Sequence, residues 1–129
     1  MAVVNGYLHA LEAGDATAYV ALCQPKVGYF NEGLKTQGYI HRSRELFMTH
    51  WTDYHVYNLR NVSIRDTSDP ATKSVSFTYE WSARSLVHSS KHGTTTGTPK
   101  TGTVTDTLDV HNGEGRWLIT KMWQDIVVR

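Results

Sequence analysis

Residues 74–87 alternate apolar and polar side chains at nearly every step. The apolar positions are Val75, Phe77, Tyr79, Trp81, Ala83 and Val87, and the polar positions are Ser76, Thr78, Glu80, Ser82 and Arg84. A period of two places these sets on opposite faces of a β-strand. The pattern therefore predicts a long central strand, whose aromatic face requires a thick cover from other elements.

Two short helices are predicted at the start of the chain. Residues 2–13 carry apolar side chains at helical spacing, and Gly14 is a natural stop because glycine adopts the left-handed conformation without a Cβ penalty. Asp15 can then act as the N-cap of a second helix over residues 16–23, which Pro25 ends. Together these segments predict a helical hairpin.

Three further elements are predicted between this hairpin and the central strand. Residues 27–34 form a short extended segment that Gly33 interrupts. Thr36 can cap a third helix, whose apolar face is Tyr39, Ile40, Leu46, Phe47 and Trp51. Residues 53–65 indicate a strand whose apolar parity changes phase, which predicts a β-bulge near residues 60–61.

The C-terminal third predicts strands joined by hairpins. Residues 88–102 hold three Gly, one Pro and a run of Thr and Ser, which predicts either a long hairpin connection or strand ends that fray into one. Residues 103–110 alternate again, Asn112 and Gly113 are a hairpin turn signal, and residues 117–127 form a last strand. Three helices followed by such strands predict an α+β fold, with the helices packed on a curved antiparallel sheet that forms a cone with a cavity.

Length and composition are typical of a small globular domain. The chain has 129 residues, 40% hydrophobic and 11% aromatic, so we expect a single domain over residues 1–129 with a sizeable core. Thirteen basic and twelve acidic residues give a formal charge of +1, which provides no electrostatic footprint for nucleic acid or an anionic membrane. No signal peptide and no apolar run of roughly 20 residues is visible, so we expect a cytoplasmic location.

Neither the histidines nor the cysteine forms a recognisable reactive site. The seven histidines include no local set of three or four converging ligands, so no metal is expected. The single cysteine, Cys23, lies on an apolar helical face where its thiol would be protonated and inert. No glycine-rich phosphate loop is present, and no cofactor is expected.

One acidic residue breaks the apolar pattern of its strand. Asp106 has the same parity as the apolar residues Val104, Leu108 and Val110. This parity predicts a carboxylate that faces the interior of the cone, where it must be paired, neutralised or wet. The alternative is a bulge or a register shift that turns it outward. Tyr79 and Trp81 lie on the inward face of the neighbouring strand, so a phenol or indole donor could reach this carboxylate.

Several of these features give the chain a resemblance to the nuclear transport factor 2-like superfamily. They are the Gly14-Asp15 hairpin, the segment from Tyr29-Phe30 to Gly33, the helix ending in Trp51, and residues 115–119 at the last strand. Residues 29–59 are also similar to modules at the ends of bacterial multidomain proteins, with Thr52 in place of the usual Pro. The resemblance implies a conical cavity, dimers formed through the sheet face, and either cavity enzymes or association modules without catalysis.

Two classes of function follow. The first is a non-catalytic module that binds a small apolar molecule or associates with other chains. The second is a cavity enzyme of the isomerase, dehydratase or cyclase type, which transfers protons on a small apolar substrate. No acid–base pair is visible in the sequence, which favours the first class.

The residues and partners that these functions would use can also be stated. Ligand contacts are expected from Asp106, Tyr57, Tyr79, Trp81, Tyr29 and Trp117. The expected partner is a second copy of the chain, bound through the face that carries Ser76, Thr78, Glu80, Ser82, Arg84 and Leu86. No partnership with nucleic acid or a membrane is expected.

Overall fold

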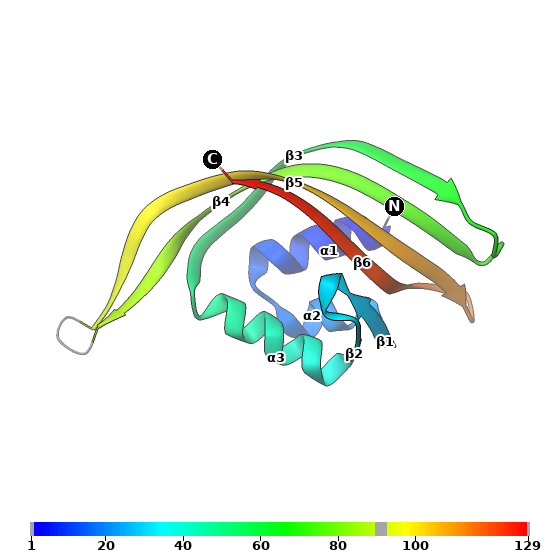
Figure 1. The fold of residues 1–129 in the computed structure, drawn as a ribbon, viewed down its shortest axis with the longest axis horizontal. Coiled ribbons are helices and arrows are strands. Elements are labelled where there is room, and N and C mark those ends of the chain that lie inside the picture. Colours follow the sequence, from blue (N-terminus) through cyan, green and yellow to red (C-terminus); the bar gives the residue numbers. More distant parts are fainter. Residues whose placement is uncertain (1, 90–92, 129) are drawn as a thin grey trace.

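Three helices and a six-stranded sheet form the structure, a computed structural model that describes residues 2–89 and 93–128 (Figure 1). In chain order the elements are α1 (Ala2–Ala13), α2 (Ala16–Val20), β1 (Cys23–Tyr29), the 3-10 turn η1 (Phe30–Glu32), β2 (Leu34–Thr36), α3 (Gln37–Met48), β3 (Trp51–Asp66), β4 (Thr72–Ser89), β5 (Gly93–Gly113) and β6 (Arg116–Val128). None of the helices in this described part is long and apolar enough to cross a membrane.

The sheet bends over the helices, which all lie on its concave side (Figure 1). Its strand order is β2-β1-β6-β5-β4-β3, and only the β1–β6 pair is parallel among the described strands. The sheet does not close on itself, so its concave face needs the helices as a cover. The predicted α+β architecture, with N-terminal helices on one face of a curved sheet, is confirmed.

The central strand β4 follows the predicted alternation along most of its length. Its inward side chains are buried at Val75, Phe77, Tyr79, Trp81 and Ala83. Val87 departs from this pattern, since its side chain is 49% exposed. A register shift between Arg84 and Leu86 changes the parity of the strand just before it.

The helical hairpin forms at the predicted corner. Gly14 has φ +63°, and the Asp15 side chain accepts a 2.9 Å hydrogen bond from the backbone N–H of Ala18. However, α2 ends at Val20, so the helix predicted to reach residue 23 is too long. Cys23 instead begins β1 and pairs with β6, because the new sheet neighbour supplies the backbone hydrogen bonds that a longer helix would have made.

For residues 88–102 the sequence left open a long hairpin connection or strand ends, and in the described part of the segment the strand ends are correct and the long connection is wrong. Strand β4 runs to Ser89 and β5 starts at Gly93, with these two residues paired. Cross-strand pairing overrides the Gly and Pro signals, because the Thr residues between them suit a strand. Pro99 pairs with Arg84 beside the register shift.

Two smaller predictions concern turns and bulges. Asn112 and Gly113 stay in β5, and the hairpin turns at Glu114 and Gly115, both with positive φ. The bulge predicted in β3 is confirmed, since the register shifts on both sides of Arg60. These shifts bend the strand and add to the curvature of the sheet.

Candidate functional site

A cavity of about 300 Å³ lies between the concave face of the sheet and the helices. Every long strand and two helices contribute to its wall. The lining residues are Tyr7, Leu11, Phe30, Arg44, Phe47, Trp51, Tyr54, Tyr79, Trp81, Lys100, Val104, Gln124 and Ile126. None of these described lining residues is Asp, Glu or His. The wall is therefore mostly apolar, with two cationic side chains among its polar groups.

Four aromatic rings form one connected part of this wall. Tyr54 stacks on Trp81 with the ring centroids 6.1 Å apart and the planes 3° apart. Trp51 meets Trp81 edge-on at 6.0 Å, and Phe47 lies 6.3 Å from Trp51 and 5.9 Å from Tyr54. Each ring contacts at least two others, so the wall is held in place before any ligand arrives.

Arg44 brings a positive charge to the cavity from α3. Its guanidinium lies 4.9 Å from the Tyr19 ring centroid and 4.6 Å from that of Phe47, so both rings help to position it. Burial by itself would lower the pKa of the guanidinium, but the phenols of Tyr19, Tyr7 and Tyr29 raise it overall. Arg44 is therefore charged, and no ion pair joins it to a carboxylate within residues 2–89 and 93–128.

Asp106 faces the interior, as its parity predicts, and its side chain is fully buried. The Tyr79 hydroxyl donates a 2.8 Å hydrogen bond to Oδ2, whereas Oδ1 has no hydrogen-bond partner among the described residues. Burial raises the pKa of the Asp106 carboxyl to about 6, and the nearby Tyr79, Tyr7 and Gln124 side chains limit the rise. These neighbouring side chains thus compensate only part of the desolvation.

Asp106 is not itself among the residues that line the cavity. Tyr79 does line it, and its hydroxyl bonds to the carboxyl. Asp106 therefore lies behind the lining residues, in contact with the Tyr79 phenol. The sequence predicts the inward direction of this acid and a phenol or indole donor from Tyr79 or Trp81, and the structure shows that the donor is the Tyr79 phenol.

The other residues expected to contact a ligand are separated by the fold. Trp81 lines the cavity beside Tyr79. Tyr57 is 47% exposed on the edge strand β3, where it pairs with Glu80. The Tyr29 ring is buried, with its hydroxyl 3.1 Å from Ser43 Oγ, and Trp117 packs partly buried against the core. The structure does not bring Tyr57, Tyr29 or Trp117 to the cavity wall, so their predicted contacts require another site.

Arg44 is a charged lining residue that was not predicted from the sequence. It stands in a polar run of α3 between Arg42 and Glu45, where a charged side chain is usually solvated. Its spacing did carry a signal, because Ile40, Arg44 and Phe47 follow one another at helical intervals of four and three residues. A cation within an apolar stripe indicates an unusual environment in the same way as Asp106 does in its strand.

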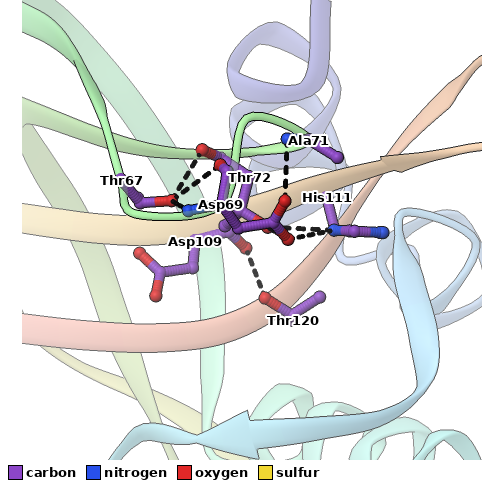
Figure 2. Close-up of polar contacts among 7 residues, drawn as sticks. All are labelled: Thr67, Asp69, Ala71, Thr72, Asp109, His111 and Thr120. Carbon is purple, nitrogen blue, oxygen red and sulfur yellow. Dashed lines mark hydrogen bonds and ion pairs between the residues drawn. The ribbon is translucent and has the colours of Figure 1, made fainter.

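A second polar cluster lies away from the cavity, at the turn from β3 to β4 (Figure 2). The Asp69 carboxylate accepts hydrogen bonds from the Ala71 N–H at 3.0 Å and the Thr72 hydroxyl at 2.9 Å, and His111 Nδ1 lies 3.5 Å from it. The hydrogen bonds from Ala71 and Thr72 lower the pKa of the Asp69 carboxyl. The cluster ties the turn to β5, and no group of three or more His, Cys, Asp or Glu in the described part could hold a metal ion.

Comparison with known proteins gives structural relatives only. No family model and no curated protein sequence matches the chain. A protein from Streptomyces avermitilis that is assigned as a dehydratase of the NTF2-like family superimposes with a TM-score of 0.75 at 16% identity, covering 99% of this chain and 94% of that one. A type 2 hexachlorocyclohexane dehydrochlorinase gives a TM-score of 0.76 at 7% identity, covering 98% and 82%.

A third relative differs from these two in what its name describes. It is assigned as a calcium/calmodulin-dependent protein kinase II association domain from Xanthomonas campestris, and it superimposes with a TM-score of 0.70 at 15% identity, covering 98% of this chain and 84% of that one. At such identities the likeness shows the fold and leaves the function open. With its helices on the concave side of a curved, open sheet, the chain has the nuclear transport factor 2-like fold.

Proposed function

We propose that this chain is a non-catalytic module that binds a small, largely apolar molecule in the cavity under the sheet. The observation that carries the proposal is the connected wall of Phe47, Trp51, Tyr54 and Trp81 around a space of about 300 Å³. Ligand sites are typically concave, mostly apolar and supplied with a few polar groups. The size suits a molecule of one or two rings.

The lining residues support binding rather than proton transfer. A general acid or base must come within hydrogen-bond reach of the substrate. Asp106 lies behind the wall, and its accepting oxygen already receives the Tyr79 hydroxyl. The described lining includes no carboxylic acid and no imidazole. A ligand in the cavity would therefore contact phenols, rings and cations.

Binding can be tested with 2-naphthol as a neutral two-ring probe and tryptophan fluorescence as the readout, since Trp51 and Trp81 line the cavity. We expect saturable quenching in the wild-type protein. Ile126→Trp places a bulky ring on a lining residue that is 48% exposed, and it should weaken binding at least tenfold. Ile64→Trp is the matched control, because Ile64 is 51% exposed on β3 and does not line the cavity. Failure of the wild type to bind any one- or two-ring probe would overturn the proposal.

Proton transfer is a second candidate, and the pKa of about 6 at Asp106 favours it. Such a carboxyl can exchange a proton near neutral pH, and Tyr79 could connect it to a substrate. Several structural relatives are assigned as dehydratases, a dehydrochlorinase or a polyketide cyclase.

Deuterium exchange separates the two candidates. 2-Tetralone, a two-ring ketone with acidic C–H bonds, can be incubated in heavy water with and without the protein and followed by NMR. Acceleration that Asp106→Asn abolishes would establish proton transfer. Binding of the ketone without acceleration would leave the chain as a binding module.

A further inference from the structure

We propose that the cavity selects ring compounds that carry an anionic oxygen group, with Arg44 as the counterion. This inference rests on the proposed binding function and specifies the chemistry of its ligand. It concerns the charged part of the wall, which the aromatic rings alone do not explain.

The first observation is the sign of the charge in the cavity wall. Arg44 and Lys100 are the only charged side chains among the described lining residues. The whole chain carries a formal charge of only +1, so the cavity concentrates positive charge in an otherwise balanced protein. A low-dielectric wall strengthens the field of such cations and favours anions in the space between them.

The second observation is that the Arg44 guanidinium lacks an anionic partner. Half-buried arginine in a protein usually pairs with a carboxylate, since its charge is costly to remove from water. Within residues 2–89 and 93–128, no carboxylate lies at ion-pair distance from Arg44. Burial raises the pKa of the Asp106 carboxyl and the charge of Arg44 lowers it in part, but this carboxyl forms no ion pair with Arg44, its Oδ2 accepts from Tyr79, and it is not among the described lining residues. The position of a counterion is thus available to a ligand.

The third observation is that the guanidinium is already positioned. The Tyr19 and Phe47 rings lie 4.9 Å and 4.6 Å from Arg44 Cζ. Arginine presents a rigid fork of donors that matches a planar carboxylate, and fixing it beforehand reduces the entropy lost on binding. Phe47 also belongs to the aromatic wall, so the cation and the ring surface share one residue. One ligand can therefore contact both.

Two probes of the same shape test the inference, 2-naphthoate and its neutral analogue 2-naphthamide, titrated into the wild-type protein by calorimetry at pH 7.5. We expect naphthoate to bind at least tenfold more tightly, a difference of about 1.4 kcal/mol. Equal binding of the two probes would overturn the inference and leave the proposed function intact. Absence of binding by both would count against the proposed function itself.

Variants assign the preference to Arg44. Arg44→Gln should reduce naphthoate affinity at least tenfold and change naphthamide affinity less than threefold. Arg42→Gln removes an exposed charge from the same helix and should leave the preference unchanged. A preference that survives Arg44→Gln in a folded protein would overturn the assignment. If that variant does not fold, two other measurements provide the test: the preference of Lys100→Gln for naphthoate over naphthamide, and the salt dependence of naphthoate binding by the wild type. If Lys100→Gln keeps the full preference and added salt does not weaken naphthoate binding, the inference is overturned.

A third probe identifies the anionic group. 2-Naphthyl phosphate has the same rings and a larger, more highly charged head. Tighter binding of naphthoate supports a carboxylate ligand, which the planar guanidinium fork matches. Tighter binding of the phosphate keeps Arg44 as the counterion and identifies a phosphate monoester as the ligand class.

Discussion

The Tyr79 hydroxyl donates a 2.8 Å hydrogen bond to Asp106 Oδ2, and both side chains are fully buried. The two residues are not directly opposite in the sheet, since Asp106 pairs with Phe77 and Tyr79 pairs with Val104. The long tyrosine side chain reaches along the inward face to a diagonal neighbour. The phenol thereby covers the carboxyl and leaves it without contact with the cavity.

Asp106→Asn should change how stability depends on pH. Burial raises the pKa of the Asp106 carboxyl in the folded protein to about 6 from its ordinary value near 3.8, so the native state holds a proton that the unfolded state releases. Stability therefore falls as pH rises from about 4 to about 6, by about 3 kcal/mol at about 1.36 kcal/mol per pH unit. The asparagine of the variant does not titrate, so its stability does not fall in this way. The free energy of unfolding of the variant minus that of the wild type should therefore rise by about 3 kcal/mol between pH 4 and pH 7. Urea melts at constant protein concentration measure the difference, and parallel curves would contradict the assignment.

Trp81→Ala should be strongly destabilising. The ring is 8% exposed and contacts both Tyr54 and Trp51, so truncation leaves a hole in the wall. Such changes typically cost about 3–5 kcal/mol, a large share of a total stability near 5–15 kcal/mol. Trp123→Ala is the control, because its ring is 40% exposed and it should cost about 1 kcal/mol or less. If thermal melts give both variants the same melting temperature, the packing of Trp81 does not contribute to stability as proposed.

Two glycine substitutions should have opposite signs. Gly14 has φ +63°, and an added Cβ would lie 2.9 Å from Met48 Sδ, so Gly14→Ala should destabilise by about 1–2 kcal/mol. Gly38 lies in α3, and an added Cβ would meet nothing within 4 Å. Gly38→Ala should therefore stabilise by up to about 1 kcal/mol through helix propensity. Denaturant titration of both variants checks the prediction. If the free energy of unfolding changes in the same direction for both, the prediction is wrong.

We propose that two copies of the chain pair through the convex face of the sheet. Figure 1 shows no helix on that side. Hydroxyl pairs cover its centre, where Thr78 Oγ1 lies 2.9 Å from Thr105 Oγ1. Sedimentation equilibrium at micromolar concentration should give twice the chain mass of 14.6 kDa. Thr105→Arg should yield a monomer, whereas Leu46→Arg, at a residue of α3 that is 62% exposed, should not. A wild-type monomer would remove the proposal.

Local chemistry made several parts of the structure predictable from the sequence. Gly14 and Asp15 specify the helical corner because one tolerates positive φ and the other caps the next helix. The alternation in β4 identifies the buried face, and the same period of two orients Asp106 inward. These features depend on a few neighbouring residues, so a sequence read without a structure contains them.

Pairing between distant segments decided the rest. Cys23 joins a strand because β6 offers it a partner, and residues 93–102 extend β5 because β4 continues alongside them. The cavity also depends on distant segments, because Arg44 from α3 and Tyr79 from β4 line the same space only after the sheet bends over the helices. The sequence by itself determined the helical corner, the inward face of the central strand and the direction of the buried acid. Only the tertiary structure decided which side chains share the cavity, because that depends on contacts between residues far apart in the chain.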